Sequence, residues 1–250
     1  MTQTVAARAL YAYAVVRPPA GPRRPVDAGL ELVESGGLAA VVAEVPLSDF
    51  GEDVLPARLN DRGWLEATAR DHDAIVHRLL RLTTVIPLRF GSIHRDRAAV
   101  ERFLEERRDV FEAALERLAG RVELGVKVSV GGGDAAGIEE PSPPTGRDYL
   151  ERRRRERDAA ATRAARLDER LRAIHERLVG IAEAAVLNRP QPRELTGATE
   201  EMVLNAAYLV ARGDEVFPRE VERLGIEHPD LVFEVTGPWA PYNFVGGDDA

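Results

Sequence analysis

Apolar residues in the second half of the chain recur at intervals of four and three, and this spacing constrains the fold more than any other feature. The positions are Ala160, Ala164, Leu167, Leu171, Ile174, Leu178 and Ile181. Side chains at these intervals share one face of an α-helix. The pattern therefore predicts a long helix from about Asp148 to Ala185. We call this apolar stripe the seam. It is compatible either with packing on a sheet or with pairing with another helix, and we favour packing on a sheet.

Strand patterns surround this predicted helix. Residues 122–130 alternate between apolar and polar, and the later elements are short apolar runs at 184–188, 202–210 and 231–236 and an amphipathic helix at 214–224. From residue 122 the order is therefore strand, helix, strand, strand, helix, strand. This order is that of the ferredoxin-like unit. We expect a C-terminal ferredoxin-like (βαββαβ) domain with a long helix.

The first half of the chain mixes strands and helices in another order. Its predicted elements are strands at 9–16, 30–34, 38–45 and 84–88 and helices at 64–82 and 100–118. The turn residues Ser35-Gly36-Gly37 join the second and third strands as a hairpin. The predicted fold class is therefore α+β with two domains. We expect a mixed α+β domain at 1–120 and the ferredoxin-like domain at 121–250.

A segment rich in glycine and proline, GGGDAAGIEEPSPPTG at 131–146, precedes the long helix and predicts a flexible loop. Its first residues, Gly131 to Ala136, match the G-x-G-x-x-A pattern of dinucleotide-binding loops. A loop of that kind opens directly into a helix whose amides hold the pyrophosphate. Here two glutamates and several prolines intervene. We expect no nucleotide site and no cofactor.

Composition argues against several classes of function. The chain has no cysteine, which excludes disulfides and thiolate zinc sites and agrees with a reducing cytoplasm. Its formal net charge of −8 argues against an unaided affinity for nucleic acid or anionic lipid. The N-terminus alternates like a strand, so we expect no signal peptide. No apolar run reaches the roughly 20 residues of a membrane span.

One basic run could suggest nucleic acid. Arg152–Arg155 and Arg157 lie in the first turns of the predicted long helix. Glu151, Glu156 and Asp158 are interleaved with them. Because no aromatic stacking platform accompanies these arginines, the pattern indicates a solvated helix face and no nucleic-acid site.

A histidine between two aspartates supports the one enzyme hypothesis that the sequence carries. A cleft around His72, Asp71 and Asp73 would suit a small-molecule enzyme. His72 also falls on the apolar stripe of the 64–82 helix, which favours a buried, hydrogen-bonded core histidine. His72 and His77 lie about 140° apart around a helix, so they cannot bind one metal together. We expect no catalytic residue and no metal site.

The chain ends on aromatic residues, where termini are ordinarily polar. EVTGPWAPYNFV at 234–245 begins at the end of the last predicted strand, and IPLRFGSIH at 86–94 joins a strand to a turn with Arg89 and Phe90 side by side. The rings either cap the core between the two halves of the chain or form a docking surface for a partner. The sequence leaves both roles open. The candidate partner-binding or interdomain residues are Arg89, Phe90, Pro238, Trp239, Tyr242 and Phe244.

Short landmarks occur in a fixed order along nearly the whole chain. They are Tyr11-Ala12-Tyr13, the hairpin Gly36 to Pro46, the helix with Trp64, His72 and Val76, VIPLRFG at 85–91, GVKV at 125–128 and TGPWAPY at 236–242. In this order the landmarks resemble the gas vesicle accessory proteins of the GvpF/GvpL family. The chain departs from that family at Ala240, where a second proline is common, and this departure makes the tail less stiff.

The resemblance implies a non-enzymatic role in gas vesicle assembly, in the cytoplasm and associated with the vesicle. It implies binding to the hydrophobic shell protein GvpA, either as a chaperone or adaptor that shields it or as a minor vesicle component. Contact with other gas vesicle accessory proteins is implied as well. The resemblance also implies two α+β domains, the second a modified ferredoxin-like one, which agrees with the element order from residue 122.

Overall fold

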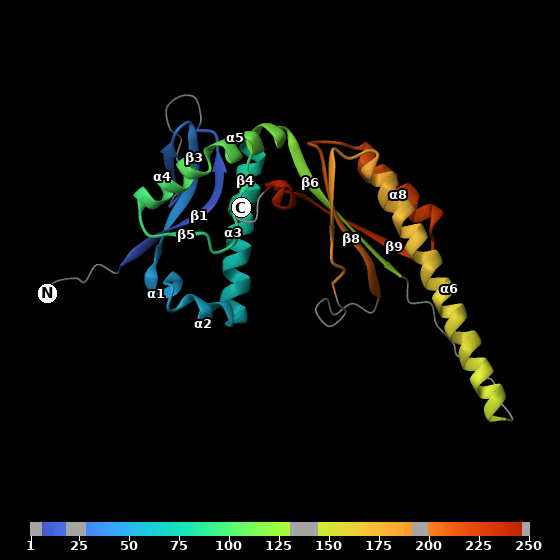
Figure 1. The fold of residues 1–250 in the computed structure, drawn as a ribbon. Coiled ribbons are helices and arrows are strands. Elements are labelled where there is room, and N and C mark those ends of the chain that lie inside the picture. The colour runs from blue at the N-terminus through green and yellow to red at the C-terminus, as the bar shows by residue number, and fades with distance from the viewer. Residues whose placement is uncertain (1–6, 19–28, 131–144, 192–199, 247–250) are drawn as a thin grey trace. The chain divides into compact units, whose positions relative to one another are not determined.

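The computed structural model describes residues 7–18, 29–130, 145–191 and 200–246. By its internal contacts the chain divides into two compact units, Met1–Glu123 with Gly237–Ala250 and Leu124–Thr236. Each unit contains one β-sheet together with helices (Figure 1). The fold is therefore mixed α+β with two sheets, which agrees with the fold class expected from the sequence.

The sheet of the first unit is built around its first strand. Its strands are β1 (Arg8–Val16), β2 (Glu31–Ser35), β3 (Leu38–Pro46), β4 (Ile86–Pro87) and β5 (Ile93–His94). Their order is β2-β3-β1-β4, with β5 also pairing with β1, and each of these pairs is antiparallel. The predicted hairpin forms, since Gly36 and Gly37 both adopt positive φ, as a two-residue type I′ turn requires.

A β-bulge interrupts β1 at Tyr13. The register with β3 passes from Ala12 opposite Val42 to Ala14 opposite Val41, so Tyr13 has no partner residue on that strand. The carbonyl oxygen of Tyr13 instead accepts the N–H of Leu88 at 2.9 Å. Bulges re-aim side chains and occur frequently beside functional sites.

The helices of the first unit depart from the prediction at two places. They are α1 (Leu47–Phe50), α2 (Leu55–Leu59), α3 (Arg62–Leu82), α4 (Arg97–Glu106) and α5 (Arg108–Arg117). The single helix predicted at 100–118 is wrong, because the backbone leaves the helical region at Arg107 and divides it into α4 and α5. The helices α1 and α2 were not predicted, since four or five residues are too short to show a helical period.

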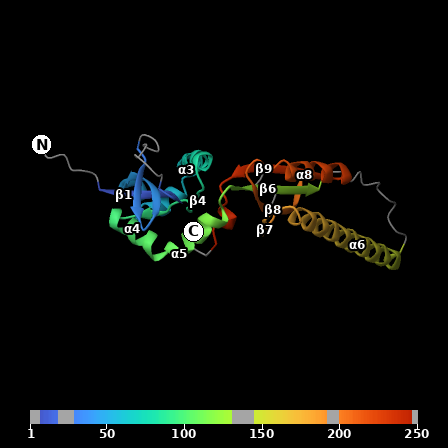
Figure 2. The same ribbon diagram turned by 90° about the horizontal axis from the view of Figure 1, so that it is seen from above.

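The second unit has the elements β6 (Arg121–Val130), α6 (Gly146–Val179), β7 (Ala184–Asn188), β8 (Glu201–Ala211), α8 (Val216–Glu227) and β9 (Leu231–Trp239). Its strands lie in the order β7-β8-β6-β9. The two helices cover one face of this sheet, as Figures 1 and 2 show, because Tyr208 of β8 contacts both His175 of α6 and Phe217 of α8. The fully buried Tyr208 is also hydrogen-bonded to His175 Nδ1 at 2.7 Å.

The long helix packs on this sheet through its C-terminal part alone. The buried side chains of α6 are Leu171, Ile174 and Leu178. Ala160 and Ala164, on the same predicted seam, are exposed. Packing on the sheet is therefore confirmed for half of the seam, and α6 ends six residues earlier than expected. None of the described helices is both long enough and apolar enough to cross a membrane.

The C-terminal segment departs most from the expected organisation. β9 continues to Trp239, three residues beyond the predicted strand. A single 3₁₀ turn, Tyr242–Phe244, follows it. By its contacts, Gly237–Ala250 groups with the first unit, whereas the sequence suggested a second domain of residues 121–250 that included this segment. The candidate dinucleotide loop, Gly131 to Ala136, lies outside the described residues.

Candidate functional site

His72 lies at the centre of a hydrogen-bonded group that joins three distant parts of the first unit. The helix that carries it, α3, is capped at its N-terminus by Asp61, whose side chain accepts the N–H of Trp64. The residue is only 3% exposed, and its Nδ1 lies 3.0 Å from the Tyr11 hydroxyl of β1. Its Nε2 lies 3.1 Å from the hydroxyl of Tyr242 in the C-terminal segment. The predicted buried core histidine is thus confirmed.

The direction of the hydrogen bonds follows from one backbone donor. Gly91 N–H donates to the Tyr11 hydroxyl at 3.0 Å, and with this donor in place we assign the hydroxyl proton of Tyr11 to its hydrogen bond with Nδ1 of His72. Nε2 of His72 then carries the ring proton and donates it to Tyr242. Burial lowers the pKa of His72, although the nearby Asp73 acts in the opposite direction. Burial thus favours the neutral imidazole, both of whose nitrogens lie within hydrogen-bond distance of a tyrosine hydroxyl.

The two tyrosine hydroxyls keep their protons near neutral pH. Burial raises the pKa of Tyr11 to about 12. Burial, followed by the charge of Asp73, also raises the pKa of Tyr242. The imidazole of His72 and the two phenols therefore form a hydrogen-bonded structural network.

Aromatic rings surround this network. The Tyr11 ring lies 4.7 Å from Tyr13 and 5.6 Å from Phe50, measured between ring centroids. Phe90 and Tyr242 lie 6.1 and 6.4 Å from the ring of His72. Rings at these separations stabilise one another beyond their buried area. Strand β1, helix α3, the turn after β4 and the C-terminal segment therefore meet at His72.

The enzyme hypothesis receives no support from this geometry. Asp71 and Asp73 are exposed, and His72 is buried rather than placed in an open cleft. An open depression of the surface is lined by Tyr13, Asp71 and His77 among others, and His72 is not part of its lining. In the part of the chain that the structure describes, no three histidine or acidic side chains are placed to hold a metal ion. Nothing here indicates catalysis.

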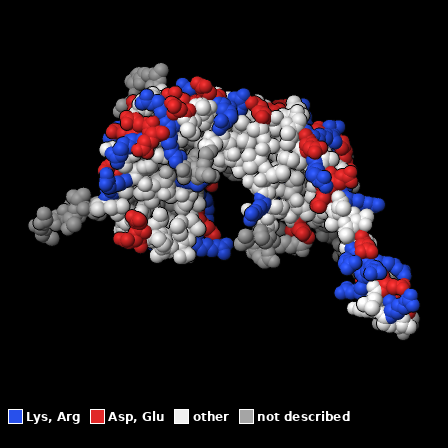
Figure 3. Space-filling model, viewed as in Figure 1, with Lys and Arg blue, Asp and Glu red and all other residues white. Residues whose placement is uncertain are grey.

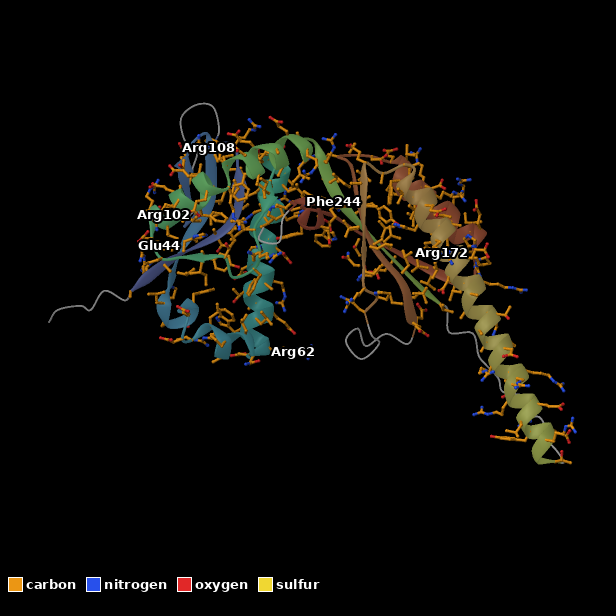
Figure 4. The ribbon with its side chains drawn as sticks, in the orientation of Figure 1. Glu44, Arg62, Arg102, Arg108, Arg172 and Phe244 are labelled. Atoms are coloured by element: carbon orange, nitrogen blue, oxygen red, sulfur yellow. The ribbon has the colours of Figure 1, made fainter. Side chains whose placement is uncertain are left out.

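The C-terminal segment is fixed to the first unit by two further polar anchors. The buried carboxylate of Glu123 accepts the backbone N–H of Asn243 at 2.9 Å and its side-chain amide at 2.7 Å. Arg117, at the end of α5, donates to the carbonyl oxygens of Phe244 and Val245 at 2.7 and 3.0 Å. The aromatic terminus is therefore an ordered part of the first unit. Figure 4 labels Phe244 within this segment.

The six candidate residues fall into two groups in the structure. Phe244 is 8% exposed, and Phe90 is half-buried beside His72. Trp239 and Tyr242 remain 45% and 38% exposed. Arg89 and Pro238 are exposed as well. The structure thus brings Phe90 and Tyr242 together at one histidine and leaves the outer ring of Trp239 uncovered.

Sequence reasoning missed Glu123 and Arg117. Glu123 alternates with Val122 and Leu124 in a strand pattern, which ordinarily places a polar side chain toward solvent. Its partner Asn243 is 120 positions away. No local sequence pattern predicts a polar contact between residues so far apart in the chain. The one signal available was a glutamate within a predicted apolar strand.

The buried Glu123 gives a pH-dependent prediction. Burial raises the pKa of its carboxyl above the ordinary 4.5, although the two Asn243 donors act in the opposite direction. A carboxyl with a raised folded-state pKa contributes most to stability below its unfolded-state pKa, and this contribution falls as the pH rises through the folded-state pKa. We expect the stability advantage of the wild type over Glu123→Gln to shrink as the pH rises above 4.5. Urea denaturation at several pH values measures it, and an advantage that grows with pH would contradict the assignment.

Comparisons with known proteins agree with these landmarks. The family model described as "Gas vesicle synthesis protein GvpL/GvpF" matches residues 9–246. The chain is 43% identical to gas vesicle protein L of Streptomyces sp. (strain CB03234), over 96% of this chain and 93% of that protein. It is 27% identical to gas vesicle protein F2 of Halobacterium salinarum, over 83% of this chain and 76% of that protein.

Solved structures share the fold. The crystal structure of GvpF from Anabaena sp. PCC7120 superposes with a TM-score of 0.68 at 18% identity, covering 96% of this chain and 97% of that one. The crystal structure of GvpF from Microcystis aeruginosa superposes with a TM-score of 0.67 at 19% identity, covering 95% of this chain and 99% of that one. Since the family model spans both units and the C-terminal segment, the chain belongs to the GvpL/GvpF family of gas vesicle synthesis proteins.

Proposed function

We propose that this protein is a non-enzymatic accessory factor of gas vesicle assembly that binds the shell protein GvpA and shields its hydrophobic surface. The match to the GvpL/GvpF family over residues 9–246 carries this proposal. A shell subunit with a gas-facing apolar surface would aggregate before it polymerises, because exposed apolar patches and strand edges associate. An acidic partner that covers such a patch keeps the subunit available for the growing wall.

The partner-binding surface that we propose is the exposed part of the C-terminal segment. Trp239 is 45% exposed although it is held on an anchored segment. An exposed, positioned aromatic ring loses little conformational entropy on binding, which makes it a suitable anchor. Arg89, Pro238 and Tyr242 are also exposed and complete this surface. The other two candidate residues are less exposed, since Phe244 is buried and Phe90 is half-buried beside His72.

We also propose a domain assignment and a place of action. The strand, helix, strand, strand, helix, strand order of the second unit supports a modified ferredoxin-like domain that begins near residue 121. The preceding residues form the N-terminal α+β domain, to which the C-terminal segment returns. The protein acts in the cytoplasm, in association with the vesicle and with other gas vesicle accessory proteins.

Co-purification of the tagged chain with GvpA from cells that make vesicles tests this function. We expect Trp239→Ala to weaken capture of GvpA by about thirtyfold, since loss of a central aromatic anchor costs about 2 kcal/mol. Ile226→Ala is the control, because Ile226 is an apolar residue that is 81% exposed on α8 and belongs to the second unit. Capture by this control is expected to equal that of the wild type.

Two results would overturn the proposal. Absence of any association between the unmutated chain and GvpA would remove the binding claim. Retention of the protein on intact vesicles after a denaturant wash would indicate a built-in minor component of the wall instead of a transient shield.

A further inference from the structure

The N-terminal part of α6 is a helix with no sheet beneath it. We call residues 146–166 the arm. Every buried side chain of α6 lies beyond the arm, from Leu171 onward. Within the arm all residues are exposed except the half-buried Arg152. At 1.5 Å per residue the arm is about 31 Å long. Figures 1 and 2 both show it extending past the sheet of its own unit.

Among the residues that the structure describes, local interactions hold the arm in helical form. Thr145 caps its first turn by accepting the N–H of Asp148 at 3.2 Å. Ion pairs one turn apart follow along its surface, among them Arg147 with Glu151 and Arg152 with Glu156. Alanine and arginine, which dominate its composition, are strong helix formers. The arm is therefore organised before any partner arrives, which lowers the cost of binding.

One face of the arm combines apolar side chains with two arginines. Leu150, Arg154, Arg157, Ala161 and Ala164 recur at intervals of four and three, so they form one stripe. Leu150 is 68% exposed on this stripe. By the same helical geometry Glu151, Glu156 and Asp158 lie about 80–120° from Leu150 around the helix, and Asp148 lies about 160° from it.

The arginines of this stripe are available to a partner. Among the described residues Arg154 has no ion pair, and Arg157 pairs with its chain neighbour Asp158 at 3.7 Å. The arm contains eight arginines and four acidic residues, whereas the whole chain has a formal net charge of −8. Figure 3 shows these basic side chains at the projecting end of the helix. The arm is thus a basic element on an acidic protein.

We propose that this stripe is a docking site for an acidic amphipathic helix of another protein. A helix with small apolar residues and carboxylates at intervals of three and four would place its acids against Arg154 and Arg157 and its apolar side chains against Leu150 and Ala161. A second copy of this chain does not fit face to face, because its own stripe would oppose arginine to arginine. The proposal concerns a different surface from the one proposed for GvpA, and its test does not involve GvpA.

The test uses the full chain and a defined probe. The probe is a fluorescein-labelled peptide of four Glu-Ile-Ala-Ala-Leu-Glu-Gln heptads, compared with its lysine counterpart, in a fluorescence anisotropy titration. We expect the acidic peptide to bind and the lysine peptide not to bind. Arg154→Glu combined with Arg157→Glu is expected to weaken the binding of the acidic peptide about tenfold, since it turns two attractive charge contacts into repulsive ones.

A control variant separates a specific face from a general charge effect. Arg155→Glu combined with Arg166→Glu changes the net charge equally, but these residues lie about 140–160° from Leu150 around the helix. This variant is expected to bind the acidic peptide like the wild type. Circular dichroism at 222 nm checks that both variants keep their helix.

Several outcomes would overturn the proposal. No binding of the acidic peptide, or equal weakening by the two charge-reversed variants, would show that the stripe is not a docking face. Tighter binding of a DNA duplex than of the peptide would indicate a nucleic-acid surface. A dimer in light scattering that only the Arg154→Glu, Arg157→Glu variant abolishes would indicate a second copy of this chain as the occupant.

Discussion

Replacing His72 with phenylalanine is expected to lower the free energy of unfolding by about 2–4 kcal/mol. Phenylalanine keeps the approximate shape of the ring and removes both nitrogens. The Tyr11 hydroxyl then loses its partner in a buried site, and the Tyr242 hydroxyl loses a partner in a partly buried one. A buried polar group without a partner costs about 1–3 kcal/mol. Urea denaturation followed by circular dichroism measures this loss.

The control for this variant lies on the same helix. His77→Phe makes the same chemical change at a half-exposed position and is expected to alter stability by no more than about 0.5 kcal/mol. Tyr242→Phe completes a double-mutant cycle, since its cost should shrink in the His72→Phe background if the two side chains interact. Equal losses for the two histidine variants, or additive losses in the cycle, would contradict the network.

His72 shows which inferences a sequence supports well. The helical period placed it on the buried face of α3, and the structure confirms that position. Its partners could not be derived in the same way, because Tyr242 is 170 positions away along the chain. Periodicity reports which side of an element faces the core, whereas the identity of the facing residue depends on how distant elements come together.

Some boundaries of helices and strands could be predicted from local sequence, and others could not. β7 begins and ends at the predicted residues 184 and 188, since a short apolar run between breakers specifies a strand. The break at Arg107 was invisible, because arginine is a strong helix former and the apolar period continues across it. The shift of the C-terminal segment to the first unit was also invisible, since it rests on Arg117 and Glu123, which contact residues more than a hundred positions away.

From the sequence, the aromatic C-terminal segment is either a cap on the core or a surface for a partner. The exposed fractions of its side chains assign these two roles to different rings. Phe244 is buried and Trp239 is largely exposed. A ring that is already covered contributes to folding, whereas an uncovered ring is available for binding. Substitutions at these two positions should therefore have opposite profiles of stability and partner capture.

We expect Phe244→Ala to lower the free energy of unfolding by about 3 kcal/mol, because truncating a buried phenylalanine removes its transfer free energy and leaves a cavity. Trp239→Ala, at a ring that is 45% exposed, is expected to change stability by no more than about 0.5 kcal/mol while it weakens GvpA capture. Urea denaturation of the two variants compares them directly.

Hydrogen exchange locates the effect of Phe244→Ala within the segment. Asn243 directly precedes Phe244, and its backbone N–H donates a hydrogen bond to Glu123. Loss of the buried ring should let this segment open more often, so the backbone amide of Asn243 should exchange faster in Phe244→Ala than in the wild type. In Trp239→Ala the exchange rate of this amide should equal that of the wild type. A stability loss below about 1 kcal/mol with an undisturbed Asn243 amide would show that the polar anchors at Arg117 and Glu123 hold the segment without the ring.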